Sequence, residues 1–185
     1  MSHVKMSRQW AMPNKWTFTI PPIKQLLAEE MDDGLWCDPF AGENSPAELS
    51  NDLREDMPTR YHMDALAFLK TIEGDSCDGV LYDPPYSITQ AKICYEGCGM
   101  DKLETKPTSM KYWADCKNEI ARISKVGGKV ICFGWNSMGL GKNRGFEMQR
   151  ILLVPHGGSK NDTIVTVEQK LDIPKRWSND THQRP

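Results

Sequence analysis

Short apolar runs, each about as long as one buried strand, alternate along the chain with segments that have helical periodicity. The runs that predict strands cover residues 35–37, 47–49, 79–82 and 130–133. Helices are predicted over residues 21–31, 63–70 and 109–124, where apolar residues recur every three or four positions. Two further β-rich runs, Phe146–Val154 and Thr163–Lys170, flank a turn with two glycines, which is typical of a hairpin.

This order of elements predicts a mostly parallel α/β sheet with an antiparallel C-terminal hairpin, in a single domain over residues 1–185. The first crossover must be compressed, because the stretch between Asp38 and Ala47 has hardly any room for a helix. Parallel strands usually need about a dozen residues between them. Outside the pattern lie an irregular N-terminal segment (1–20), a long loop (87–108) and a loose polar tail (174–185).

Composition narrows the class of protein. The chain is 39% hydrophobic and 26% charged, which is typical of a globular protein. No apolar run reaches membrane-spanning length and no signal-peptide core follows Met1, so we expect a cytoplasmic protein without a membrane partner. Cys94 and Cys98 have neither a second matched pair nor a nearby histidine, so no metal site is expected.

Acids follow three of the predicted strands. These acids are Asp38, Asp52 and Asp83, and a fourth, Asp64, opens a predicted helix. Ligands of an open parallel sheet bind beyond the carboxyl ends of its strands, so the acids are expected to face one crevice. Taken singly, Asp52 reads more simply as a turn residue, and Asp64 as a helix-opening acid stabilised by the helix dipole. Taken together, four acids that follow strands or open a helix in this order along the chain favour a binding site.

The third of these strands runs into the tetrapeptide Asp83-Pro84-Pro85-Tyr86. Two prolines restrict the backbone and offer no N–H, so the loop presents acceptors, namely the Asp83 carboxylate and the Pro84 carbonyl. Two acceptors suit an exocyclic amino group, which has two N–H donors. Tyr86 adds a flat face on which a flipped base can stack.

In these residues the sequence resembles the S-adenosylmethionine-dependent amino-methyltransferases, whose catalytic motif is similar to DPPY at 83–86. DPFAG at 38–42 resembles their cofactor loop, and SNDL at 50–53 resembles their ribose-binding strand end. YHMDALAFL at 61–69 resembles the segment whose acid contacts the cofactor adenine. The combination is most similar to small phage-associated DNA N6-adenine methyltransferases. The cofactor loop departs from the family at residues 43–45, where a second glycine and a threonine are usual.

The resemblance implies a Rossmann-like fold, S-adenosylmethionine as cofactor with S-adenosylhomocysteine as product, and DNA as partner. The implied catalytic residues are Asp83, Pro84, Pro85 and Tyr86. The implied cofactor-binding residues are Trp10, Asp38, Pro39, Phe40, Ala41, Asn51, Asp52, Asp64, Ala65 and Asp83. QWAMPNKW at 9–16 is similar to the N-terminal cofactor segment of Dam-type adenine methyltransferases, with Trp10 and Lys15 as the matching residues.

Charge gives a weaker prediction of the partner. The net charge of −2 makes no global case for nucleic acid, so DNA binding requires a local basic face. Candidates are Lys92, in the target loop expected at 87–108, and Lys142 and Arg144, in a glycine-rich loop. Ordinary surface charge explains the last two equally well. The chain has no recognisable target-recognition domain, so a homodimer that covers the target site stays open.

The first hypothesis is therefore methyl transfer to adenine N6 in DNA, since aspartate at the head of the tetrapeptide favours adenine within the family. Cytosine N4, RNA and protein glutamine remain alternative acceptors. A catalytically inactive subunit that binds the cofactor is a third reading. The expected compartment is the cytosol of a bacterium or of a phage-infected host.

Overall fold

The computed structural model describes residues 3–85, 110–158 and 161–172. The strands are β1 (Lys5–Arg8), β2 (Trp36–Asp38), β3 (Leu49–Ser50), β4 (Cys77–Tyr82), β5 (Ser124–Gly134), β6 (Phe146–Val154) and β7 (Thr163–Lys170). The helices are α1 (Pro21–Glu30), α2 (Ala65–Thr71) and α4 (Met110–Ile123), with 3-10 turns η1 (Thr17–Thr19) and η2 (Lys142–Arg144). Within the described ranges, none of the helices has the length and apolar character that crossing a bilayer requires.

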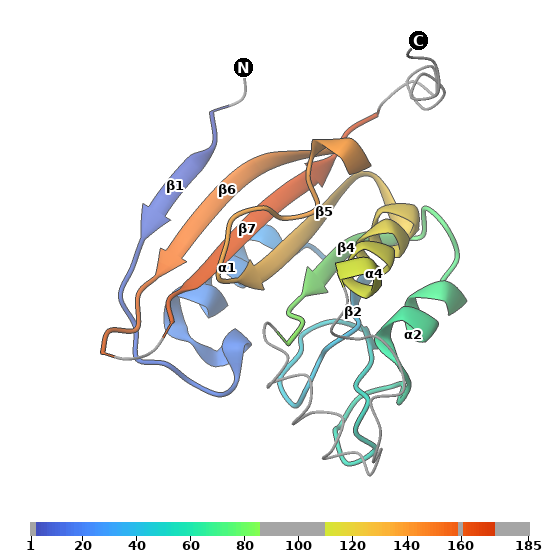
Figure 1. The fold of residues 1–185 in the computed structure, drawn as a ribbon, viewed down its shortest axis with the longest axis horizontal. Helices are drawn as coiled ribbons and strands as arrows, with labels where there is room; N and C mark the ends of the chain where they lie inside the picture. Colours follow the sequence, from blue (N-terminus) through green and yellow to red (C-terminus); the bar gives the residue numbers. More distant parts are fainter. Residues whose placement is uncertain (1–2, 86–109, 159–160, 173–185) are drawn as a thin grey trace.

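Seven strands form one sheet in the order β1-β6-β7-β5-β4-β2-β3 (Figure 1). β7 pairs antiparallel with both β5 and β6, and every other pair in the sheet is parallel. The predicted mostly parallel α/β sheet with an antiparallel C-terminal hairpin is confirmed. The compressed first crossover is confirmed as well, because residues 39–48 join β2 to β3 through turns without a helix.

Side chains along the central strands alternate between two apolar cores, one on each face of the sheet. On β4, Leu81 packs into the core that contains α1, whereas Val80 and Tyr82 pack into the core of α2 and α4. Figure 1 shows the same layers, with α1 on one side of the sheet and α2 and α4 on the other. Burial on both faces explains why these strands have continuous apolar runs in the sequence.

The direction of strand order reverses at β2. From β2 the chain passes to β3 on one side and then returns, through α2, to β4 on the other side. In open α/β sheets ligands bind at such a switch point, beyond the carboxyl ends of the two strands. Asp38 ends β2 and Asp83 follows β4 directly, so the fold brings both acids to this crevice.

Two expectations about local structure are wrong. The segment 1–20 is not irregular throughout, because Lys5–Arg8 forms β1, which pairs parallel with β6. This edge strand is mostly exposed, so its sequence, KMSR, has no apolar alternation by which to recognise it. β5 begins at Ser124, before the predicted run at 130–133, and a register shift against β4 interrupts its first part. The expected target loop (87–108) and tail (174–185) lie outside the described residues.

Candidate active site

Asp38 is fully buried at the end of β2 and shapes the turn that follows. Its carboxylate accepts hydrogen bonds from the backbone N–H of Phe40 at 3.0 Å and from the hydroxyl of Ser45 at 2.6 Å. The pKa of Asp38 is raised to about 7, because burial, aided by the nearby carboxylates of Asp83 and Asp52, outweighs the lowering effect of the two hydrogen bonds. Asp38 thus acts on a ligand through the turn, since protein groups surround its carboxylate.

Asn51, at the end of β3, ties this turn to the segment before α2. Its side-chain amide donates to the carbonyls of Pro39 at 3.1 Å and Met63 at 3.0 Å, and it accepts from the Met63 N–H at 3.1 Å. Its backbone carbonyl accepts from the N–H of Ala41 at 2.9 Å. Asn51 is buried, so its role in this structure is to hold two loops together.

Asp52 fixes the far end of the turn. Its carboxylate accepts from the N–H of Gly42 at 3.1 Å and from the N–H of Arg54 at 2.8 Å. Gly42 has a φ of +57°, which an L side chain adopts only with strain, and a Cβ there would lie 3.5 Å from the ring of Trp16. The turn backbone therefore runs close to the N-terminal segment.

Asp64 caps α2, as the simpler interpretation of this acid predicts. One carboxylate oxygen accepts from the N–H of Ala67 at 3.0 Å, and the other accepts from the hydroxyl of Tyr112 at 2.7 Å. The second contact joins α2 to α4. Ala65, the first residue of the helix, is buried in the core on that face of the sheet.

A pocket of about 160 Å³ opens between the turn after β2, the N-terminal segment and the end of β4. We call it the turn pocket. Its lining residues are Lys15, Trp16, Thr17, Phe18, Phe40, Ala41, Gly42, Asn44 and Asp83. Of the residues that the family resemblance implies for the cofactor, Phe40, Ala41 and Asp83 line it, and Asp38, Asn51 and Asp52 hold its walls.

Trp10 does not join this pocket. Its side chain is 57% exposed, and the chain beside it pairs with the end of β6, where the Gln9 N–H donates to the Leu153 carbonyl at 3.0 Å. Trp16 lines the pocket instead, with the Lys15 ammonium 4.6 Å from its ring centroid. The segment 9–16 contains both tryptophans, and the sequence alone offers no physical signal that selects Trp16.

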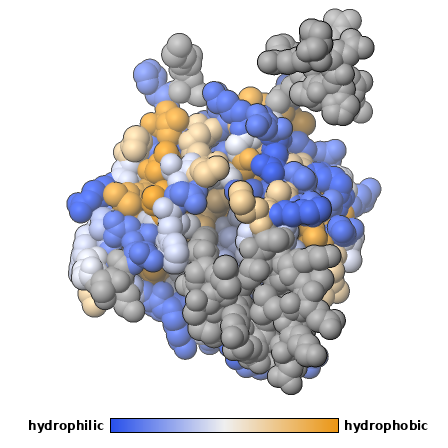
Figure 2. All heavy atoms as spheres, viewed as in Figure 1, coloured by the Kyte–Doolittle hydropathy of each residue, from blue (hydrophilic) through white to orange (hydrophobic). Residues whose placement is uncertain are grey.

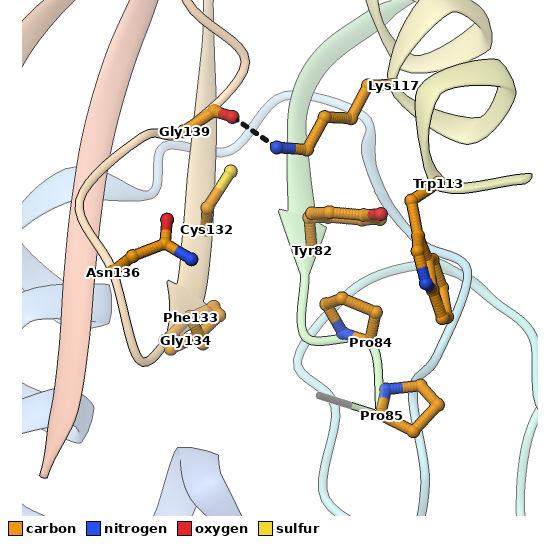
Figure 3. A pocket seen from close by; sticks show the side chains of 10 residues that line it. All are labelled: Tyr82, Pro84, Pro85, Trp113, Lys117, Cys132, Phe133, Gly134, Asn136 and Gly139. Carbon is orange, nitrogen blue, oxygen red and sulfur yellow. Dashed lines mark hydrogen bonds between the residues drawn. The ribbon is translucent and has the colours of Figure 1, made fainter. Parts of the chain in front are cut away.

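A second pocket, of about 190 Å³, lies on the other side of the loop after β4 (Figure 3). We call it the proline pocket. Its lining residues are Tyr82, Pro84, Pro85, Trp113, Lys117, Cys132, Phe133, Gly134, Asn136 and Gly139. Asp83 faces one pocket and the next two prolines face the other, so the predicted catalytic loop is the wall between them.

Sequence reasoning missed the residues that complete the proline pocket. Trp113 and Lys117 come from α4, and Asn136 and Gly139 come from the loop that follows β5. Lys117 donates to the carbonyl of Gly139 at 2.6 Å and so connects the two sides. Trp113 lies at helical spacing among core residues, and nothing in its sequence context separates a pocket wall from a core position.

Neither Lys142 nor Arg144 lines either pocket, although Arg144 bonds to Leu140, the residue after Gly139 of the proline pocket. β6 runs parallel to β5, since both pair antiparallel with β7, so η2 lies near the edge where β5 begins, whereas the pockets lie where β5 ends (Figure 1). Arg144 donates to the Asn118 side chain at 2.9 Å and to the Leu140 carbonyl at 3.0 Å. Figure 2 shows a hydrophilic surface around η2, which fits ordinary surface charge. Binding of DNA by Lys142 and Arg144 stays a prediction.

Tyr86 and Lys92, predicted for base stacking and for DNA, lie outside the described residues.

Comparison with solved structures finds proteins of similar fold. TrmN from Thermus thermophilus matches with a TM-score of 0.53 and 18% identity over 82% of this chain and 49% of its own. The 1,6-didemethyltoxoflavin-N1-methyltransferase of Burkholderia thailandensis, with 1,6-didemethyltoxoflavin and S-adenosylhomocysteine bound, matches with a TM-score of 0.54 and 14% identity. The match covers 82% of this chain and 77% of that protein. A SAM-dependent methyltransferase from Methanosarcina mazei matches with a TM-score of 0.51 and 12% identity. The match covers 79% of this chain and 97% of that protein.

These likenesses show that the chain has the fold of SAM-dependent methyltransferases, as the sequence resemblance implies. The chain spans about half the length of TrmN. No protein-family model and no curated protein matches the sequence.

Proposed function

We propose that this protein transfers a methyl group from S-adenosylmethionine to the exocyclic N6 amine of adenine in DNA. The observation that carries the proposal is that two pockets meet at Asp83-Pro84-Pro85, one on each side. A transfer between two bound substrates needs such an arrangement, because the donor and acceptor atoms must come together across one short stretch of chain.

The turn pocket suits S-adenosylmethionine. Asp83 lines it, and Asp38 and Asp52 lie near enough for their charges to affect one another. This concentration of acids favours a cationic ligand, and the cofactor is positively charged at its sulfonium. The flat rings of Trp16 and Phe40 add apolar walls for a nucleoside. A protein of the same fold holds S-adenosylhomocysteine, which supports the assignment.

The proline pocket would receive the adenine. Pro84 is buried and neither proline has an N–H, so the loop offers acceptors to an amine and no competing donor from these two residues. Trp113 lies opposite the prolines and gives a flat wall for an aromatic ring (Figure 3). An aromatic ring bearing an amino group fits both properties of this pocket.

In the proposed reaction Asp83 and the Pro84 carbonyl accept the two N–H bonds of the amine. The lone pair of an aromatic amine is delocalised into the ring, and these contacts would localise it on nitrogen. S-Adenosylmethionine, when bound, supplies the methyl group from its sulfonium. A nitrogen–carbon bond forms while the carbon–sulfur bond breaks, and one amine proton leaves by way of Asp83 to solvent. Holding both partners in line contributes roughly 7–11 kcal/mol in well-oriented reactions.

The test is methylation of mixed-sequence DNA with labelled cofactor, followed by mass spectrometry of the nucleosides. The wild type should yield N6-methyladenine, and Asp83→Ala should lower the rate at least about 100-fold, since it removes an acceptor that acts in the transition state. Cofactor binding by the variant, measured by calorimetry, separates a chemical defect from an empty turn pocket.

Label in N4-methylcytosine, RNA or protein glutamine alone would overturn the choice of acceptor. Cofactor binding without turnover on any of them would point to an inactive subunit.

A further inference from the structure

We propose that Asn136 selects the acceptor by donating a hydrogen bond from its side-chain amide to a ring nitrogen next to the methylated amine. This inference rests on the proposed function and adds a specificity-determining residue to it. Asn136 follows β5 at the mouth of the proline pocket and lines it.

The orientation of the Asn136 amide follows from its own loop. Its side-chain oxygen accepts a hydrogen bond from the backbone N–H of Met138 at 3.0 Å. That contact identifies the oxygen and leaves the NH₂ group at the other end of the amide. In Figure 3 the NH₂ group points into the pocket, toward the side where Pro84 lies.

The loop that carries Asn136 is anchored beyond it. Lys117 donates to the carbonyl of Gly139 at 2.6 Å, and the buried carboxylate of Glu168 accepts from the backbone N–H groups of Leu140 and Gly141. A donor on such an anchored loop loses little conformational entropy when it binds a ligand.

The pocket therefore offers acceptors on one wall and a donor on another. Pro84 supplies an acceptor on the first wall, next to Asp83 at the boundary with the turn pocket, and Asn136 supplies the donor. Adenine has an amine beside an unprotonated ring nitrogen, N1, and matches this pattern. Cytosine, with its amine beside N3, matches the pattern as well, whereas thymine has only carbonyls beside its ring N–H and would pair with neither wall.

The test compares oligonucleotides that contain adenine or 1-deazaadenine at the target position, with wild type, Asn136→Ala and Asn143→Ala. The wild type should lose about tenfold in kcat/KM when N1 becomes C–H, which is the effect of one hydrogen bond. Asn136→Ala should lose a similar factor on adenine and show no further loss on 1-deazaadenine. Asn143, exposed on η2, serves as the matched control and should keep the wild-type ratio.

The comparison of ratios removes any change in amine reactivity caused by the altered ring, because that change is common to all three enzymes. Cofactor affinity and the unfolding midpoint should be equal in Asn136→Ala and wild type. The inference is overturned if Asn136→Ala shows the same ratio of kcat/KM on adenine to kcat/KM on 1-deazaadenine as the wild type. It is also overturned if the wild type has equal kcat/KM on both bases, and in both cases the proposed function stands. A wild type that methylates neither oligonucleotide nor mixed-sequence DNA overturns both.

Discussion

At the scale of single residues, Asp38 illustrates how an acid can build a site without facing the ligand. It is fully buried, and its two hydrogen bonds go to Phe40 and Ser45 in the turn that lines the pocket. Ser45 belongs to the stretch at which the chain departs from the related cofactor loops. Ser45, one of the residues that differ from the related loops, therefore forms a hydrogen bond to a buried acid of the same protein.

Asp38 should make stability fall as pH rises toward neutrality. Its pKa is raised from 3.8 to about 7, so the folded state favours the protonated acid, whereas the unfolded chain ionises it at lower pH. The resulting stabilisation is complete below about pH 4 and disappears as the pH rises through about 7. Asp38→Asn keeps an acceptor for the Phe40 N–H, replaces the acceptor of the Ser45 hydroxyl with an NH₂ that can donate to the Ser45 oxygen, and removes the titration.

Urea denaturation at several pH values measures the effect. Between about pH 4 and pH 8 the wild type should lose on the order of 4 kcal/mol relative to Asp38→Asn. Parallel pH profiles for the two proteins would mean that Asp38 titrates as an ordinary exposed acid.

At the scale of elements, the loop between β5 and β6 depends on one glycine that contacts a buried acid. Gly139 has a φ of +54°, and a Cβ there would overlap the carboxylate of Glu168. Gly127 has a φ of +81°, but a Cβ there meets no atom of the described residues within 4 Å. A substitution at Gly127 therefore adds backbone strain alone, whereas one at Gly139 adds backbone strain and steric overlap.

Gly127→Ala should cost about 1–2 kcal/mol of unfolding free energy, the strain of a left-handed conformation. Gly139→Ala should cost about 3 kcal/mol or more, because it also displaces the acceptor of two backbone N–H groups. Chemical denaturation of the two variants gives the difference. Equal losses would show that Glu168 moves aside freely.

The same scale shows what can and cannot be predicted from the sequence. The central strands and the C-terminal hairpin follow from apolar runs, because burial leaves a direct trace in the pattern. β1 has no apolar pattern in the sequence, since its pairing with β6 uses backbone groups and its side chains are mostly exposed. The loop proposed to be catalytic was recognisable from two adjacent prolines after an acid. The far wall of its pocket was not, because Asn136 and Trp113 meet only in the folded chain.

At the scale of the whole molecule, the site draws on the N-terminal end of the described chain. The N-terminal segment passes from β1, at one edge of the sheet, to the turn pocket near β2 and β4 (Figure 1). Its lining residues, Lys15 to Phe18, precede α1. A chain shortened at this end would lose a wall of the turn pocket as well as an edge strand.

Trp16→Ala should weaken binding of S-adenosylmethionine about tenfold or more, because a large aromatic wall of the turn pocket is removed. Trp10→Ala is the matched control and should leave the affinity unchanged, since Trp10 lies outside the lining. Calorimetric titration of both variants tests the prediction, and a larger loss for Trp10→Ala would contradict it.

The short crossover after β2 has a consequence for which nucleotides the crevice admits. In dinucleotide-binding folds a helix begins at this point, and its N-terminal N–H groups with their partial positive charge bind the pyrophosphate. Here residues 39–48 form turns, and the acids at 38, 52 and 83 stand in the same place. We therefore expect the crevice to bind ATP and NAD poorly, because residues 39–48 provide no helix N-terminus that could anchor a phosphate.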